Sequence, residues 1–119
     1  MFDDLKIVYL EDEPIVALDT SEHLKNLGFG EVKVVSRLRD AEALTCEDNF
    51  DVALFDINVD KGQTSLELGH QLASRGTKVI FASGNSSLGR EISGESILFL
   101  DKPFSLTQLT SMLKQAANT

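Results

Sequence analysis

Five short runs of mostly apolar residues recur along the chain. They are IVYL at 7–10, VKVV at 32–35, VALF at 52–55, VIFA at 79–82 and ILFL at 97–100. The runs are rich in Val, Ile and Phe and show no strict alternation of apolar and polar residues, which is typical of strands buried on both faces of a parallel sheet. We therefore predict five strands.

The stretches between the runs carry helix signals. Pro14 is suited to the first turn of a helix, and Gly28 is suited to its end. The second stretch, around residues 38–48, is helical by composition, and the third stops before Gly76. The fourth, residues 84–96, is rich in Gly and Ser, so we expect a short or mobile helix there.

The last stretch has the clearest helix signature. Ser105 and Gln108 have the spacing of a capping box. An apolar stripe at helical spacing follows, formed by Leu106, Leu109, Met112, Leu113 and Ala116. We interpret this stripe as part of the core.

Strands that alternate with helices predict an α/β fold. Parallel strands need crossover connections, and right-handed crossovers place helices on both faces of the sheet. The expected architecture is a doubly wound, five-stranded parallel sheet, with residues 1–119 forming one domain.

Charge and composition exclude some functions. The formal net charge is −8, so we expect neither nucleic acid nor an anionic membrane as a direct partner. The apolar runs are far too short to span a membrane. Cys46 is a lone cysteine and nothing at the N-terminus resembles a signal peptide, so the expected location is the cytoplasm.

Polar residues with chemical potential follow four of the predicted strands. Glu11 and Asp12 follow the first, Asp56 the third and Ser83 the fourth, and Lys102 comes shortly after the fifth. The carboxyl ends of parallel strands lie at one edge of the sheet, where such folds bind ligands. These five side chains are therefore expected to converge.

The expected cluster is suited to phosphoryl transfer. Three neighbouring carboxylates repel one another unless a cation lies between them, and Mg²⁺ prefers oxygen ligands. Asp56 could attack phosphorus, while Lys102 offsets phosphoryl charge and Ser83 donates a hydrogen bond. Each residue alone could be an ordinary turn former or helix cap. Their joint arrangement is harder to explain that way.

Four segments resemble a known family. IVYLEDEP, VALFDIN, VIFASG and FLDKPF are similar, in order and spacing, to segments of the receiver domain of two-component response regulators. The resemblance covers nearly the whole chain. It implies the flavodoxin/CheY-like fold with strand order 2-1-3-4-5.

The resemblance also implies roles for individual residues. Asp56 matches the phosphoacceptor, and Lys102 matches the phosphate-binding lysine, preceding a cis bond to Pro103. Ser83 matches the switch hydroxyl, and Phe99 matches the aromatic residue that rotates on activation. By residue type alone, core packing explains Phe99 better, and its switching role depends wholly on the resemblance. The implied Mg²⁺ ligands are Asp12 and Asp56 directly, Glu11 through a water, and Asn58 through its backbone carbonyl.

The chain departs from the family pattern in the loop after Asp56 and after the fourth strand. Asp60 stands where many members carry proline. FASGN partly resembles a bacterial subgroup of single-domain receivers found beside HWE-type histidine kinases, with Asn85 in place of a tyrosine. His23 and His70 are read as surface or packing residues, since the family's donor histidine is on the kinase.

The predicted function is a stand-alone receiver in a bacterial phosphorelay. A histidine kinase or phosphotransfer protein would phosphorylate Asp56 with Mg²⁺, and output would be protein contact or a phosphate sink. No enzymatic activity is expected beyond self-phosphorylation from small donors and self-dephosphorylation.

Three alternatives stay open. One is a receiver-like interaction module that is never phosphorylated. Another is a flavodoxin-like cofactor-binding domain, although its phosphate loop would have to replace the acidic segment EDEP at 11–14. A small phosphatase with an aspartyl-phosphate intermediate is the third.

Overall fold

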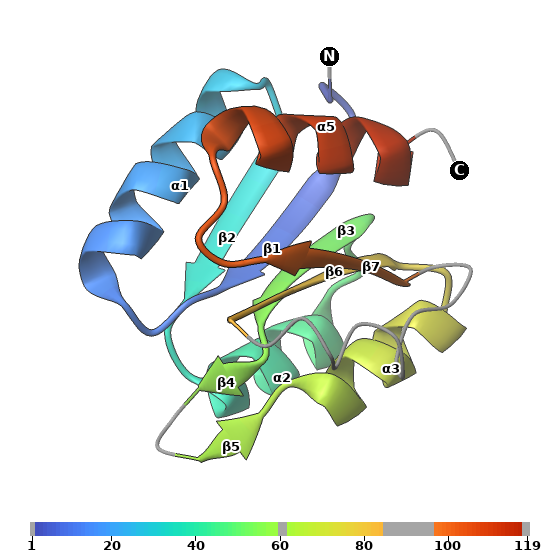
Figure 1. Cartoon of the computed structure of the whole chain (residues 1–119). Helices are drawn as coiled ribbons and strands as arrows, with labels where there is room; N and C mark the ends of the chain where they lie inside the picture. Colours follow the sequence, from blue (N-terminus) through green and yellow to red (C-terminus); the bar gives the residue numbers. More distant parts are fainter. Residues whose placement is uncertain (1, 60–61, 85–96, 118–119) are drawn as a thin grey trace.

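The computed structural model describes residues 2–59, 62–84 and 97–117. Its centre is a parallel sheet of five strands in the order β2-β1-β3-β6-β7, which confirms the predicted order (Figure 1). The strands are β1 (Lys6–Leu10), β2 (Glu31–Val35), β3 (Val52–Asp56), β6 (Lys78–Ser83) and β7 (Ile97–Asp101).

Helices cover both faces of the sheet. Helices α1 (Pro14–Asn26) and α5 (Leu106–Ala117) lie on one face, and α2 (Leu38–Glu47) and α3 (Leu66–Ser74) lie on the other (Figure 1). The helix expected within residues 84–96 falls outside the described residues, apart from Gly84. No helix in the described ranges is long and apolar enough to cross a membrane.

The helix ends follow the sequence signals. Pro14 begins α1, and the residues that follow α1 and α3 include Gly28 and Gly76, whose φ angles of 91° and 97° favour glycine. The Ser105 N–H donates to Gln108 Oε1 at 2.8 Å, and the Gln108 N–H donates to Ser105 Oγ at 3.0 Å. The predicted capping box is therefore present.

Two apolar layers pack against the sheet. On β1, Ile7 and Tyr9 join the layer beneath α1 and α5, whereas Val8 and Leu10 join the layer beneath α2 and α3. Strands β1, β3 and β6 are buried almost throughout. This two-sided burial explains why the sequence shows no alternation.

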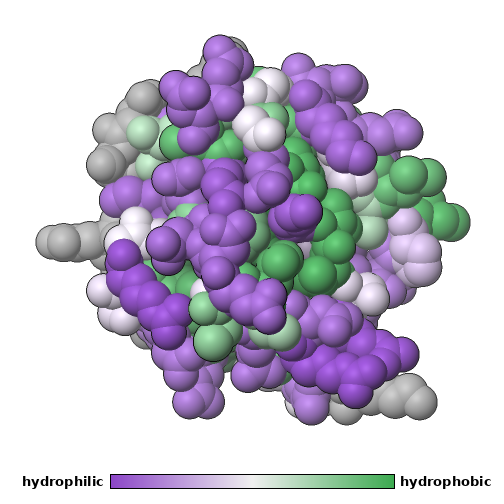
Figure 2. Space-filling view, turned by 180° about the vertical axis from the view of Figure 1, so that it is seen from behind, coloured by the Kyte–Doolittle hydropathy of each residue, from purple (hydrophilic) through white to green (hydrophobic). Residues whose placement is uncertain are grey.

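The edge strand β2 corrects the expectation of burial on both faces. None of its residues is fully buried, and Val34 is 41% exposed. It lies at the end of the sheet and has a single neighbouring strand, β1. Figure 2 views the molecule from behind. It shows a band of hydrophobic surface on this side of the molecule and a further group of hydrophobic residues at the right-hand side, where α1 lies.

A small hairpin follows β3, where the sequence analysis predicted a loop. Strands β4 (Asn58–Val59) and β5 (Gln63–Thr64) pair antiparallel. Segments of two residues are too short to show a strand period. The three residues between them end in glycine, which is a common hairpin connection.

Helix α3 packs closely on β6. A Cβ atom at Gly69 would overlap the ring of Phe81, so glycine allows the helix to approach the strand. In the sheet, Phe81 pairs with Phe99 of β7.

Candidate functional site

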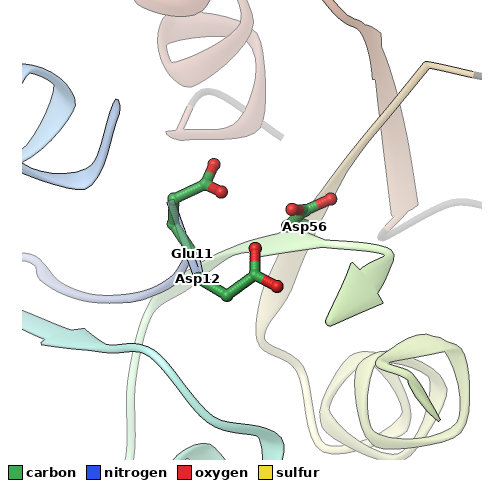
Figure 3. Close-up of side chains that lie close together, drawn as sticks. All are labelled: Glu11, Asp12 and Asp56. Atoms are coloured by element: carbon green, nitrogen blue, oxygen red, sulfur yellow. The ribbon is translucent and has the colours of Figure 1, made fainter. Parts of the chain in front are cut away.

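Three carboxylates gather at the carboxyl edge of the sheet. Glu11 and Asp12 directly follow β1, and Asp56 is the last residue of β3. Each offers an oxygen, and these oxygens lie within 4.8 Å of one another. Figure 3 shows the three carboxylates around a common space. Glu11 and Asp56 are only 2% and 8% exposed, whereas Asp12 is exposed.

Lys102 completes the cluster from the connection between β7 and α5. Its Nζ lies 3.2 Å from Glu11 Oε1 and 3.1 Å from Asp56 Oδ2. Its backbone N–H donates to the carbonyl of Ser83 at 2.8 Å, and its peptide bond to Pro103 is cis. The side chain therefore bridges the residue after β1 and the end of β3.

The electrostatics of this cluster favour a cation. Burial raises the pKa of Glu11, and Asp56 raises it further, while Lys102 opposes both. Burial lowers the pKa of Lys102, but Asp56 and Glu11 outweigh this effect, so the net pKa is raised and the ammonium stays charged. One ammonium cannot balance three carboxylates. The donor set fits a hard divalent cation such as Mg²⁺, with Glu11, Asp12 and Asp56 as available oxygen ligands.

The other predicted site residues lie on neighbouring elements. Ser83 is buried at the end of β6, next to Asp101 of β7 in the sheet register. Asn58 lies in β4, two residues after Asp56, with an exposed side chain. Phe99 is partly buried and packs against the apolar layer beneath α2 and α3. The roles assigned to these three residues stay predictions.

Two residues near the site were missed by the sequence analysis. Ser65 is fully buried; its hydroxyl donates to the carbonyl of Asp56 at 2.9 Å, and its N–H donates to the carbonyl of Ile57 at 3.0 Å. Tyr9 is buried two residues before Glu11, and burial raises the pKa of its phenol. Neither residue stood out in the sequence, because a serine before a helix usually acts only as a helix cap and a tyrosine in a strand is usually only a core residue.

His23 forms a side-chain contact that its sequence position did not predict. His23 Nε2 lies 2.7 Å from Thr110 Oγ1, which joins α1 to α5. The Thr110 hydroxyl donates its single hydrogen to the carbonyl of Leu106, so the imidazole is the donor. His70 is exposed, with its ring centroid 6.3 Å from that of Phe81. Neither of these contacts involves Glu11, Asp12 or Asp56.

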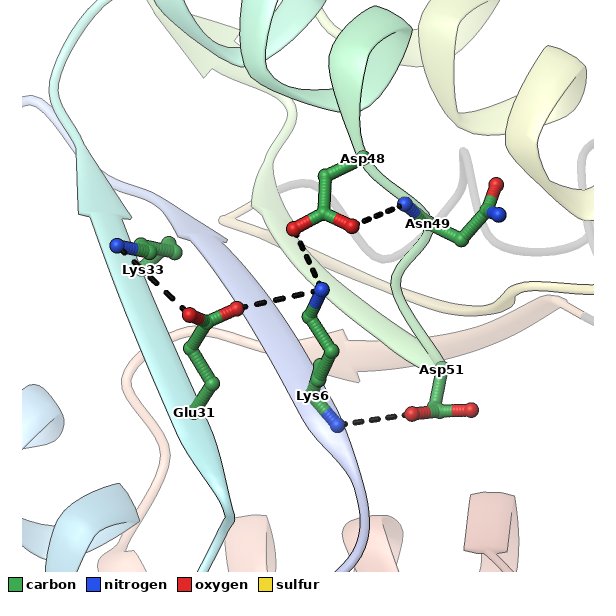
Figure 4. A network of polar contacts seen from close by, with 6 residues as sticks. All are labelled: Lys6, Glu31, Lys33, Asp48, Asn49 and Asp51. Atoms are coloured by element: carbon green, nitrogen blue, oxygen red, sulfur yellow. Dashed lines mark hydrogen bonds and ion pairs between the residues drawn. The ribbon is translucent and has the colours of Figure 1, made fainter.

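A second polar network lies at the opposite, amino edge of the sheet (Figure 4). Lys6 Nζ pairs with Glu31 and Asp48, and the Lys6 N–H donates to Asp51 Oδ2 at 2.8 Å. These contacts join the starts of β1 and β2 to the segment before β3. The side chains of these ion pairs are 32–45% exposed, so solvent screens them and they contribute little to stability.

Replacing Glu11 with glutamine is expected to stabilise the metal-free protein at neutral pH. The pKa of Glu11 is raised above its ordinary value of 4.5, so the folded state holds this proton more tightly than the unfolded chain does. The stability that Glu11 contributes is therefore present below pH 4.5 and is lost as pH rises through the higher folded pKa. The variant's advantage should be absent in acid and grow toward neutral pH, measured by urea unfolding in EDTA.

Added Mg²⁺ should reverse the order of stability, so that the wild type becomes more stable than Glu11→Gln. At one hundred times its Kd, a ligand of the folded state contributes about 2.7 kcal/mol. Glu11→Gln should bind Mg²⁺ more weakly and gain less. Glu67→Gln, an exposed position in the first turn of α3, is the matched control and should gain as much as the wild type. Equal Mg²⁺ stabilisation of wild type and Glu11→Gln would contradict the assignment of Glu11 to the metal site.

The family model for the response regulator receiver domain matches residues 7–114. No curated protein matches the chain.

Solved structures share the fold over almost the whole chain. A response regulator receiver protein from Sinorhizobium medicae has a TM-score of 0.86 at 24% identity, covering 100% of this chain and 98% of that one. The chemotaxis response regulator CheY4 of Vibrio cholerae has a TM-score of 0.80 at 20% identity, with coverages of 95% and 98%. The Thermotoga maritima response regulator TrrA, solved in complex with Mg²⁺-BeF, has a TM-score of 0.80 at 21% identity, with coverages of 94% and 98%.

At these identities the solved structures establish the fold, and the family model establishes the relationship. The matched region includes the acidic cluster at residues 11, 12 and 56 and the lysine at 102. This chain therefore belongs to the response regulator receiver domain family of two-component signalling.

Proposed function

We propose that this receiver accepts a phosphoryl group on Asp56 from a phosphohistidine of a histidine kinase or phosphotransfer protein. An oxygen of Asp56 attacks phosphorus, the bond from phosphorus to the donor nitrogen breaks, and the imidazole leaves. The observation that carries this proposal is the position of the Asp56 carboxylate, 3.1 Å from the Lys102 ammonium and among two further carboxylates.

Several residues of the chain would contribute to the phosphoryl transfer. Lys102 binds a phosphoryl oxygen and offsets its charge. Mg²⁺, when bound, supplies further neutralisation of phosphoryl charge; Glu11, Asp12, Asp56 and the carbonyl of Asn58 would hold it. Ser83 donates a hydrogen bond to the new phosphoryl group. Movement of Ser83 and Phe99 would then repack β6 and β7 and change the surface that partners contact.

A groove beside the cluster suits the phosphodonor protein. It lies between α1 and the connection from β7 to α5, has a volume of about 930 Å³ and includes Lys102 in its lining. Ile15 is 82% exposed and Leu18 is 64% exposed, an unusual exposure for large apolar side chains on one helix. Asp19 and Glu22 also line it, so a donor surface with apolar residues flanked by Lys or Arg fits best.

Changing Leu18 to serine tests this docking surface. The variant should accept phosphate more slowly from a phosphorylated histidine-kinase or phosphotransfer domain, by roughly tenfold if Leu18 is central to the contact. Its labelling by acetyl phosphate should be unchanged, because a small donor needs no docking. Leu38→Ser on α2 is a control on the opposite face; Leu38 packs partly buried against the core, so transfer rates are compared after correction for the folded fraction. Equal transfer to wild type and Leu18→Ser would exclude the groove as the docking site.

We further propose that residues 1–119 act as one receiver domain in the cytoplasm. Output would be protein contact or a phosphate sink, and catalysis would be limited to self-phosphorylation and self-dephosphorylation. The association with HWE-type kinases, based on the segment FASGN, stays a prediction.

The central test uses the wild-type protein, acetyl phosphate and either Mg²⁺ or EDTA. The expected result is one phosphoryl group per chain with Mg²⁺, stable in acid and labile in base, and none with EDTA. Absence of labelling from acetyl phosphate and from every kinase tried would favour an unphosphorylated interaction module. Co-purification of FMN would favour a cofactor-binding domain instead.

A further inference from the structure

Ser65 connects the predicted phosphoacceptor to the start of α3. It is fully buried, and it forms two hydrogen bonds to the segment that leaves β3. Its hydroxyl donates to the carbonyl of Asp56 at 2.9 Å, and its backbone N–H donates to the carbonyl of Ile57 at 3.0 Å. One residue thus binds two consecutive carbonyls at the carboxyl end of β3.

The direction of the hydroxyl is unusual for its place in the sequence. Ser65 directly precedes α3 at the capping position, where a serine hydroxyl normally accepts a hydrogen bond from the helix. Here the side chain makes no capping hydrogen bond. Its hydroxyl instead donates to the main-chain carbonyl of Asp56. The ordinary helix-capping role therefore does not explain this serine.

The two bonds also close the base of the β4–β5 hairpin. The chain leaves β3 after Asp56, forms the hairpin from Asn58 to Thr64, and returns at Ser65. Ser65 therefore holds the main chain on both sides of Ile57. One side carries the Asp56 carboxylate, and the other begins with Asn58, whose carbonyl is a predicted metal ligand.

We propose that Ser65 is a positioning residue for phosphoryl transfer, which fixes the main chain of Asp56 and so aims its carboxylate. This inference rests on the proposed function. The carboxylate must lie between the Lys102 ammonium at 3.1 Å and the space bounded by Glu11 and Asp12. Phosphoryl transfer depends on such placement, since a misplacement of about 1 Å can cost on the order of a hundredfold in rate.

The test compares Ser65→Ala with Thr77→Val. Thr77 is a matched control because its buried hydroxyl also donates to a main-chain carbonyl, that of Phe50, at 2.9 Å, but at the amino edge of the sheet. Both variants should lower the urea midpoint. Only Ser65→Ala should slow labelling by acetyl phosphate, by roughly tenfold or more at saturating Mg²⁺ and donor, with rates corrected for the folded fraction.

A second variant covers the case in which Ser65→Ala does not fold. Ser65→Cys has a similar shape and a much weaker donor, and it should also label more slowly than wild type. Measuring the Mg²⁺ Kd of each variant separates poor metal binding from a slower transfer step.

The possible outcomes distinguish the two proposals. If wild type labels and Ser65→Ala or Ser65→Cys matches its rate, the positioning role is wrong and the proposed function stands. If Thr77→Val slows labelling as much as Ser65→Ala, the effect is general destabilisation and the positioning role is again wrong. If wild type is not labelled by any donor, the proposed function fails, and the role of Ser65 fails with it.

Discussion

An Asp56→Asn variant is expected to lose phosphoryl labelling completely. The amide has nearly the same shape as the carboxylate but lacks the charged oxygen that attacks phosphorus. Folding should survive the change, because it removes one of three crowded carboxylates and leaves Lys102 paired with Glu11 at 3.2 Å. Intact-protein mass spectrometry after incubation with acetyl phosphate and Mg²⁺ measures the result.

Asp101→Asn is the matched control for this change. Asp101 is also the last residue of a strand at the same edge, but its side chain is exposed and outside the acidic cluster. It should label like wild type. Borohydride reduction of labelled wild type, followed by peptide mapping, should place the modification at position 56. Residual label in Asp56→Asn, or a modification mapped elsewhere, would contradict the assignment of the phosphoacceptor.

Replacing Lys102 with methionine should slow labelling by about a hundredfold to a thousandfold at saturating Mg²⁺, the usual effect of losing one preorganised donor to a developing oxyanion. Methionine keeps an unbranched apolar side chain but removes the ammonium that contacts both Glu11 and Asp56. The initial rate of labelling by acetyl phosphate measures the effect. Lys114→Met, an exposed position in the last turn of α5, removes the same charge and should change little.

The same variant should change the pH dependence of stability. Lys102 lowers the pKa of Glu11, so its removal raises that pKa further. The metal-free Lys102→Met protein should therefore be less stable than wild type at neutral pH, and the difference should shrink in acid as Glu11 takes up its proton. A rate close to that of wild type, or an unfolding free energy lower by the same amount at every pH, would show that Lys102 has no special relation to the carboxylates.

Much of the fold was predictable from local patterns. The capping box at Ser105 and Gln108 and the glycines after α1 and α3 depend on backbone geometry within a few residues, so the sequence displays them directly. The apolar runs indicated the five parallel strands for a similar reason. A strand buried on both faces needs apolar residues at every position.

The hairpin and the exposed edge strand were not predictable in this way. The β4–β5 pairs are too short to establish a period. VKVV at 32–35 reads much like the buried runs, yet β2 is half exposed because it lies at the end of the sheet. Its position in the strand order, rather than its composition, decides its burial.

The features of the candidate site likewise divide into those that the sequence determined and those that only the structure decided. The sequence by itself determined which chemical groups end the strands: carboxylates at 11, 12 and 56, a hydroxyl at 83 and an ammonium at 102. The strand order also led us to expect that these groups converge. Only the tertiary structure decided that the Lys102 ammonium contacts both Glu11 and Asp56 directly, and that Ser65 donates its hydroxyl to the carbonyl of Asp56 rather than capping its own helix. The physical reason is that residue types are properties of single positions. Hydrogen bonds and ion pairs depend on distances that exist only once the sheet has brought separate strands together.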